Sequence, residues 1–333
     1  MFRLATFNVR DFFDDAPPHV IGNLDRDGFG QWAQRRAKQL YHRKVESVAA
    51  MVARLDADVI AFQEIEGPQV LDAVRAHLPN GGGYLPAVAG HADARGIACG
   101  VLSRLPITSV EVHGVGQLTF PTFAEGESKP FAGRLDSRRG VLEVTVTLPD
   151  GASLALLAVH LKSARPIPRL DARGGAVDEE GHYAAAEGHA RAAVLRLAEA
   201  LHLRSRVEAR LLREGKALLA VLGDFNDAAD SLTLRAVAGE LAEPPRGRNA
   251  DLDAATSLEA GVLHHCARAV PSADRFTILH RGARVQVDHV LVSRALWRRF
   301  RGARVHNEEL RDTNGDTREE VESDHAPLVA WFE

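Results

Sequence analysis

The sequence predicts an α+β fold in which two mixed β-sheets pack face to face with helices on their outer sides. Strand-length apolar runs alternate along the chain with apolar residues at helical spacing, in two successive groups. Of the 333 residues, 45% are hydrophobic and 26% are charged, which is enough for one substantial core. No irregular stretch is flanked by an independent core-sized segment. We therefore expect one domain over residues 1–333, with loop insertions near residues 14–30, 114–139, 166–181 and 308–323.

The first half of the chain opens as strand, helix, strand. A strand-like run over Phe2–Phe7 is followed by apolar residues at helical spacing from Gln34 to Leu55 and by a strand at Val59–Phe62. A shorter helix is expected from Gln69 to Leu78, because a Pro-Asn-Gly-Gly-Gly cluster then ends it. The next predicted strands cover residues 97–103, 107–112, 141–148 and 154–159, and Pro-Asp-Gly joins the last two as a hairpin.

The second half begins with one long helix over Tyr183–Arg213, which leads into a strand over Ala217–Leu222. A hairpin is expected between Phe276–His280 and Arg284–Val292, across Arg-Gly-Ala. A short arginine-rich helix and strands near residues 304 and 328 complete the pattern.

Composition and the N-terminal residues restrict the expected setting. The formal net charge of -4 gives no global positive field, so attraction to nucleic acid requires a local basic patch. The two cysteines, Cys99 and Cys266, fit neither a zinc knuckle nor a disulfide framework, and we expect them to be buried. Strand-like sequence begins directly after Met1, and no apolar run approaches the ~20 residues of a membrane span. We expect a cytoplasmic protein without a membrane span; secretion after removal of a leader stays open.

Polar side chains suited to metal and phosphate chemistry stand at the ends of most predicted strands. They are Asn8, Glu64, His160, Asp224 with Asn226, Asp288, and Asp324 with His325. Strand ends of this kind gather on one rim of a sheet. Carboxylates and carboxamides suit a hard cation, and the histidines remain for proton and phosphate chemistry. The pattern predicts a metal-dependent phosphoesterase.

Two local motifs are the sharpest of these signals. Gly-Asp-Phe-Asn, with Asp224 and Asn226, places a carboxylate and a carboxamide on a tight turn after an apolar strand; alone, it is more often an ordinary turn. In Ser-Asp-His-Ala-Pro, neighbouring side chains point in different directions. Asp324 can thus face a metal while His325 faces the substrate, with Asp288 orienting the imidazole through its second nitrogen.

Seven motifs in order resemble the endonuclease/exonuclease/phosphatase superfamily. They are Thr6-Phe7-Asn8-Val9, Gln63-Glu64, Leu102-Ser103-Arg104-Leu105-Pro106, His160-Leu161-Lys162-Ser163, Gly223-Asp224-Phe225-Asn226, Val287-Asp288-His289-Val290-Leu291-Val292-Ser293 and Ser323-Asp324-His325-Ala326-Pro327. Each motif is weak alone, but the ordered set is specific and spans residues 2–332. The resemblance implies a four-layer α/β/β/α sandwich with its site at the shared rim of the sheets.

The resemblance also implies a metal site and a phosphate site. Glu64 would be the principal Mg²⁺ ligand, with Asn8 and Asp324 coordinating directly or through water; Mn²⁺ and Ca²⁺ are the alternative ions. Arg104 and Lys162 are the candidate substrate-binding residues, although Lys162 considered alone is an ordinary exposed lysine at a strand end.

The catalytic assignments follow the same resemblance. His325, oriented by Asp288, would act as general base or donate a hydrogen bond to the phosphate. Asp224 and Asn226 would position the attacking water, and His160 would donate to a non-bridging oxygen.

Among branches of the family, bacterial deoxyribonuclease-like enzymes are the most similar. Abasic-site endonucleases carry tyrosine where His160 stands, which disfavours that branch. The leading hypothesis is a Mg²⁺-dependent nuclease acting on DNA or RNA, monomeric and with no protein partner implied. A sphingomyelinase-like or inositol-phosphate phosphoesterase and a catalytically silent binding module are the alternatives.

Two weaker signals concern loops. Lys129, Arg134, Arg138 and Arg139 form the best local basic candidate for a nucleic-acid-binding loop. The stretch from Asp312 begins like a calcium loop but lacks the required glycine and glutamate, so a solvated acidic loop is favoured.

Overall fold

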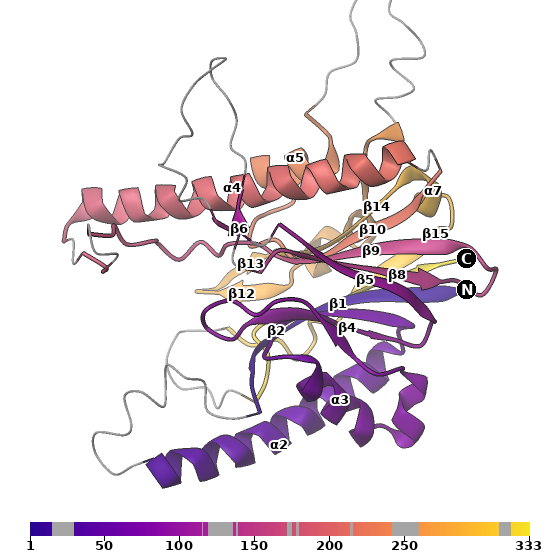
Figure 1. Ribbon diagram of the computed structural model, residues 1–333, viewed down its shortest axis with the longest axis horizontal. Helices are drawn as coiled ribbons and strands as arrows, with labels where there is room; N and C mark the ends of the chain where they lie inside the picture. Colours follow the sequence, from indigo (N-terminus) through magenta and orange to yellow (C-terminus); the bar gives the residue numbers. More distant parts are fainter. Residues whose placement is uncertain are drawn as a thin grey trace, which may run out of the picture.

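Two six-stranded sheets lie face to face between two layers of helices (Figure 1). The computed structural model describes residues 1–14, 30–114, 116–118, 136–137, 139–171, 175–177, 180–213, 216–241, 260–312 and 321–333, with the backbone alone for residues 30–38 and 117. Helices α2 (Gly30–Leu55) and α3 (Pro68–His77) cover one side, and α4 (His182–Arg213) and α5 (Leu232–Ala238) cover the other. The expected α+β sandwich is confirmed.

The first sheet has the order β15-β16-β1-β2-β4-β3. Its strands are β1 (Phe2–Phe12), β2 (Val59–Ile65), β3 (Val88–Ala89), β4 (Ala98–Ser103), β15 (Phe300–Val305) and β16 (Leu328–Phe332). Strands β1 and β2 are parallel, and α2 forms the crossover between them. The other pairs are antiparallel. Residues at the ends of β1 and β2 consequently emerge at one edge, while the two termini lie together at the opposite end of the sandwich (Figure 1).

The second sheet has the order β11-β14-β10-β9-β8-β5. Its strands are β5 (Ile107–His113), β8 (Val141–Thr147), β9 (Ser153–His160), β10 (Leu218–Asp224), β11 (His264–His265) and β14 (Asp288–Val292). Strands β9 and β10 are parallel across the long helix α4. The remaining short elements are η1 (Pro79–Gly83), β6 (Gly116–Gln117), β7 (Asp136–Ser137), η3 (Cys266–Ala269), η4 (Ser272–Asp274), β12 (Ile278–His280), β13 (Ala283–Val285) and α7 (Arg294–Trp297).

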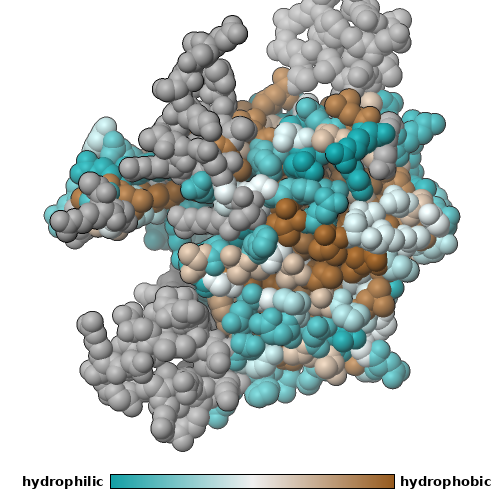
Figure 2. Space-filling view, viewed as in Figure 1, coloured by the Kyte–Doolittle hydropathy of each residue, from teal (hydrophilic) through white to brown (hydrophobic). Residues whose placement is uncertain are grey.

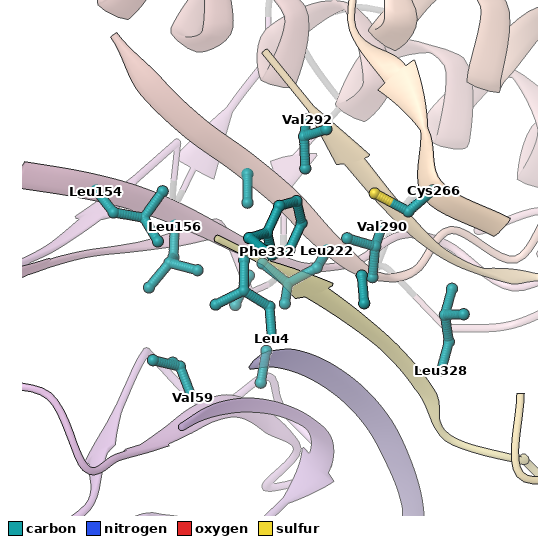
Figure 3. Packing of buried hydrophobic residues seen from close by; sticks show 14 of the residues in the cluster. Leu4, Val59, Leu154, Leu156, Leu222, Cys266, Val290, Val292, Leu328 and Phe332 are labelled. Atoms are coloured by element: carbon teal, nitrogen blue, oxygen red, sulfur yellow. The ribbon is translucent and has the colours of Figure 1, made fainter. Parts of the chain in front are cut away.

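The largest part of the core lies between the sheets. Leu4 of β1, Leu222 of β10 and Phe332 of β16 meet there, fully buried (Figure 3). Adjacent residues of the same strands point to the outer faces of the sheets and pack under the helices. Ala5 belongs to the cluster below α2, and Val221 belongs to the cluster below α4. Strands buried on both faces read as continuous apolar runs, which is why the sequence marks them clearly. Hydrophilic residues cover much of the visible surface, around a compact hydrophobic group near its middle (Figure 2).

One predicted strand is wrong in its extent. Residues 284–292 form two strands in different sheets: β13 pairs with β12, whereas β14 joins the main sheet. The break arises at buried Thr277, whose hydroxyl oxygen accepts the backbone N–H groups of Val287 and Asp288 at 3.0 and 3.1 Å. Asp288 therefore begins a strand and does not end one.

Three further expectations concern the cysteines, membrane spans and the suspected calcium loop. Cys99 and Cys266 are buried free thiols. No helix in the described ranges is both long and apolar enough to cross a membrane. Asp312 accepts the backbone N–H groups of Arg281 and Gly282 at the β12–β13 turn, while residues 313–320 of the suspected calcium loop lie outside the described ranges.

Candidate active site

Neighbouring strands bring three of the predicted residues side by side at one rim. His160 at the end of β9 is in register with Asp224 at the end of β10, and Asp224 is in register with Asp288 at the start of β14. From the facing sheet, the carboxamide Nδ2 of Asn8 donates to Asp224 Oδ2 at 3.0 Å and to Glu64 Oε1 at 3.3 Å. The two sheets are thus linked at this rim by polar contacts, in contrast to the apolar core behind it.

The backbone at this rim adopts conformations that most residues avoid. Glu64 and Asn226 have φ of 63° and 52°, in the left-handed region, which typically costs about 1–3 kcal/mol for a residue that is not glycine. Gly223 has φ of 150°, and a Cβ atom there would lie 2.0 Å from the carbonyl oxygen of Val159. Only glycine allows β10 to approach β9 this closely immediately before Asp224.

His325, which is partly buried, pairs with buried Asp288. His325 Nδ1 donates to Asp288 Oδ2 at 2.8 Å, and its Nε2 lies 4.0 Å from Asp224 Oδ2. Ser323 Oγ accepts the His325 N–H at 3.0 Å and donates to the Asn8 carbonyl at 2.6 Å. Burial alone would lower the pKa of His325, but the negative charges of Asp288, Asp224 and Asp324 outweigh it and raise that pKa to about 10. The ring carries both protons at neutral pH.

Asp224 is the most heavily hydrogen-bonded carboxylate of the site. Its Oδ1 accepts the Asn226 N–H at 2.8 Å, and its Oδ2 accepts the Asn226 side-chain amide at 3.1 Å. Burial and the neighbouring charge of Asp288 raise the pKa of Asp224 to about 7, against the opposing effect of cationic His325. The Asn226 amide also donates to the Leu161 carbonyl at 3.0 Å, which fixes the turn.

His160 lies between the two sheets' carboxylates. Its Nε2 is 3.5 Å from Asp224 Oδ2 and 3.7 Å from Glu64 Oε1, and its Nδ1 contacts the guanidinium of Arg139. Burial, together with the positive charge of Arg139, lowers the pKa of His160 well below its ordinary value. The ring is therefore neutral, in contrast to His325.

The remaining predicted metal ligands surround Glu64. Glu64 Oε2 accepts the Asp11 N–H at 3.1 Å, and Asn8 Oδ1 accepts the Arg10 N–H at 2.9 Å. Asp324 Oδ2 lies 4.0 Å from Arg10 Nε. Glu64 and Asp224 share Asn8 and His160 as neighbours, so the structure brings Asn8 and Glu64 into the same cluster as the catalytic candidates.

The donor set fits a hard divalent cation. Among the described residues, Asp224, Asp288 and His325 offer ligand atoms that all lie within 4.8 Å of one another. His325 already donates its Nδ1 proton to Asp288, so the carboxylates left for a cation are those of Glu64, Asp224 and Asp324. Asp288 Oδ1 is buried without a hydrogen-bond partner among described residues, and burial, followed by the negative charge of Asp288, raises the pKa of Asp224. Oxygen ligands in such excess suit Mg²⁺, Mn²⁺ or Ca²⁺.

The structure does not bring Arg104 to this cluster. Strand β4 is antiparallel to β2, with Ser103 opposite Val59, so Arg104 lies at the far end of β2 from Glu64. Its guanidinium donates to the Gly82 carbonyl and to Asp56 Oδ1, both at 2.8 Å. Arg104 has a structural role there, and its assignment as a substrate-binding residue is corrected.

Lys162 is close to the site but turned toward its own loop. Its ammonium donates to the carbonyls of Ser163 and Arg165 at 2.9 and 2.8 Å. It is near enough to contribute to the lowered pKa of His160. Contact with substrate would require the side chain to leave these carbonyls.

Sequence reasoning missed two residues of the rim and only partly identified a third. Arg10 follows Asn8 by two positions in β1, and its Nη1 is buried without a hydrogen-bond partner among described residues. The strand period of two could not have found it, because β1 is irregular after Asn8 and Arg10 has a left-handed φ of 52°. Asp93, in the loop before β4, left no sequence signal. Arg139 was predicted only as part of a basic loop, whose other members, Lys129, Arg134 and Arg138, lie outside the described residues.

Comparisons with known proteins concern the family and the fold of the chain. A sequence model of the Endonuclease/Exonuclease/phosphatase family matches residues 5–325. A 3′ phosphatase from Neisseria, solved with a product DNA hairpin, is 17% identical, covers 100% of both chains and has a TM-score of 0.52. Truncated TDP2 of Caenorhabditis elegans is 13% identical over 99% of this chain and 96% of that one, with a TM-score of 0.53. A mannosyl-6-phosphatase from Bacteroides thetaiotaomicron is 16% identical, covers 100% of both chains and has a TM-score of 0.53. No curated protein sequence gives a significant match.

Proposed function

The chain belongs to the endonuclease/exonuclease/phosphatase family, whose members are phosphoester hydrolases, and on that premise we propose that it is a divalent-metal-dependent nuclease acting on DNA or RNA. The observation that carries the proposal is the joining of Glu64, Asp224 and His160 at one rim, beside the His325–Asp288 pair. These residues supply the groups that hydrolysis of a phosphodiester needs: oxygen ligands for a metal ion, a proton acceptor near neutral pH, and hydrogen-bond donors for the phosphate oxygens.

The metal would be held by Glu64, with Asn8 and Asp324 as further ligands. Asn8 Oδ1 now accepts the Arg10 N–H, so direct coordination by that oxygen competes with this bond, whereas coordination through water does not. When bound, the cation would neutralise charge that develops on the phosphate oxygens.

Asp224 is the best placed residue to accept a proton from the attacking water. Its pKa of about 7 is close to the optimum for a general base at neutral pH. Asn226 donates to both of its oxygens and holds the carboxylate in one orientation. In this assignment Asn226 positions the base and does not itself exchange protons.

The two histidines would donate to the phosphate from different protonation states. His325, with a pKa of about 10, is a cation that donates a hydrogen bond and carries charge, which favours the donor role over the base role at neutral pH. Neutral His160 would donate to a second oxygen from Nε2. Preorganised donors of this kind each contribute roughly 10²-fold or more to turnover.

A nucleic-acid substrate is favoured by the surroundings of the site. Arg10 and Lys162 place positive charge beside the acidic cluster although the chain as a whole is negative. The Neisseria relative is described with a product DNA hairpin, which supports the same substrate class. The sugar phosphatase among the relatives makes a phosphomonoester the principal competing substrate.

The test is a substrate panel with and without Mg²⁺. Supercoiled plasmid, single-stranded RNA, sphingomyelin, inositol phosphates and a sugar phosphate are incubated with wild type, Asp224→Ala and His325→Ala. Asp274→Ala, at an exposed site, is the matched control. We expect Mg²⁺-dependent cleavage of nucleic acid by wild type and control only. Cleavage confined to lipid or to a phosphomonoester would replace the nuclease assignment, and cleavage of nothing would favour a binding module.

A further inference from the structure

The guanidinium of Arg139 is buried against the ring of His160. Arg139 is 8% exposed, and its Nη1 contacts His160 Nδ1, the ring nitrogen that points away from the carboxylates. The contact follows from topology: β8 runs antiparallel to β9, so the residues just before Val141 lie beside the end of β9. Arg139 thus approaches His160 from the side opposite to Glu64 and Asp224.

A guanidinium determines which nitrogen of a neighbouring imidazole can carry a proton. Arginine offers only N–H donors, has no acceptor and stays charged at any physiological pH. A ring nitrogen in contact with it must present its lone pair. In a neutral imidazole the single proton then resides on the other nitrogen, Nε2, which is the atom 3.5 Å from Asp224 Oδ2 and 3.7 Å from Glu64 Oε1.

Asp93 holds Arg139 in place. Asp93 Oδ1 accepts the N–H groups of Arg95 and Ile97 at 2.8 and 3.2 Å, which fixes the carboxylate to the loop before β4. Its Oδ2 lies 3.7 Å from Arg139 Nε and 3.3 Å from Arg95 Nη2. The Asp93 side chain is 1% exposed, so this buried carboxylate balances the buried guanidinium.

We propose that Arg139, anchored by Asp93, is a positioning residue that fixes His160 as the tautomer protonated on Nε2, so that His160 always presents a donor to the substrate. The significance for turnover rests on the proposed function, whereas the tautomer does not. The other histidine is held in the opposite way: Asp288 accepts from Nδ1 of His325 and permits a second proton on Nε2. The site would therefore contain one histidine locked as a neutral donor and one stabilised as a cation.

The direct test is the tautomeric state of His160 in ¹⁵N-histidine-labelled, metal-free protein. Long-range ¹H–¹⁵N spectra at pH 7.5 distinguish a protonated ring nitrogen from one with a free lone pair, and the His160→Gln spectrum assigns the signals by their loss. We expect a lone pair on Nδ1 and a proton on Nε2 in wild type. A wild-type spectrum with the proton on Nδ1 would overturn the proposal without any variant.

Arg139→Met removes the guanidinium while keeping an apolar stem. We expect it to give a mixture of His160 tautomers and a turnover lowered by roughly 10-fold or more, with little change in KM; Arg139→Lys, which retains a donor, should recover part of both. The matched control is Arg95→Met, which removes the other arginine from Asp93 without contacting His160 and should leave the tautomer unchanged. A folded Arg139→Met protein with the wild-type tautomer would refute the positioning role. An inactive wild type with the expected tautomer would instead refute only the nuclease assignment.

Discussion

The imidazole Nδ1 of His325 lies 2.8 Å from a carboxylate oxygen of Asp288, which stands in register with Asp224 on the neighbouring strand. The Nε2 of His325 lies 4.0 Å from Asp224 Oδ2, so the ring is held between two negative groups. The result is an imidazolium that resists deprotonation well above neutral pH.

Substituting Asp288→Asn should lower the alkaline limit of activity. His325 with a pKa of about 10 remains a cation up to that pH, and Asp288 is the main source of the stabilising charge. Without that charge the ring loses its proton at a lower pH, so the alkaline limb of the pH–rate profile moves down and turnover at neutral pH falls by roughly 10²-fold. The profile is measured on the preferred substrate at saturating Mg²⁺. Asp274→Asn serves as the control, and an unshifted alkaline limb in Asp288→Asn would argue against the cationic role.

Substituting Gly223→Ala should unfold or severely destabilise the protein. The new Cβ would meet the Val159 carbonyl at 2.0 Å, and this neighbour is backbone that cannot rotate away. We expect a loss of more than about 3 kcal/mol in the free energy of unfolding, since steric strain and displacement of β9 add together. Gly151→Ala is the matched control: its φ is 82°, but its Cβ would have no neighbour within 4 Å, so only the backbone cost of about 1 kcal/mol remains. Urea denaturation of both variants gives the comparison, and equal losses would show that the close approach is unimportant.

Stability should fall as the pH drops below about 6.5, in part because of His265. Burial is the largest effect that lowers the pKa of His265, to about 3, whereas in the unfolded chain it titrates near 6.5. The unfolded state therefore binds the extra proton between these pH values, and the free energy of unfolding decreases by up to ~1.4 kcal/mol per pH unit for this group. His265→Gln removes the titration, so its stability curve should be shallower from pH 6 to 5. Between pH 7.5 and 8.5, where His265 is neutral in both states, the curves should run parallel; a different slope there would assign the effect to another group.

Divalent cations should stabilise the wild type but not a variant lacking the principal carboxylate. Binding to the folded state alone raises the melting temperature in proportion to the logarithm of ligand excess, without any need for substrate. We expect millimolar Mg²⁺ or Mn²⁺ to raise the melting temperature of wild type and of the control Glu187→Gln, a half-exposed residue of α4 that pairs with Arg191, and EDTA to abolish the increase. Glu64→Gln should show little or no shift. An equal shift in Glu64→Gln would place the cation elsewhere.

The fold could be predicted in large part because its central strands are buried on both faces. Runs such as Leu218–Leu222 are uniformly apolar, and the long helix α4 carries a regular apolar stripe. The division of residues 284–292 between two sheets could not be predicted, because it depends on the hydroxyl of Thr277, ten residues away along the chain. Nothing in the local pattern distinguishes that break from a continuous strand.

The site was predictable where it follows from strand ends and not where it depends on strand direction. Asn8, Glu64, His160 and Asp224 all end or nearly end strands that run the same way, so sequence position was sufficient. Arg104 was misplaced because β4 runs in the opposite direction, which carries the residue after it to the other end of the sheet. The same rule, applied to the predicted hairpin of β8 and β9, would have placed Arg139 beside His160.

The position of β16 has a consequence for how the protein is made. This strand, residues Leu328–Phe332, is inserted between β15 and β1, so a segment synthesised long after β1 fills an interior place in the first sheet. Ser323, just before it, donates to the Asn8 carbonyl across 315 positions, and His325 lies beside Asp224 and Asp288. A nascent chain interrupted before this point would lack both an inner strand and the imidazole of His325, so neither the first sheet nor the candidate site could be completed before this region is synthesised.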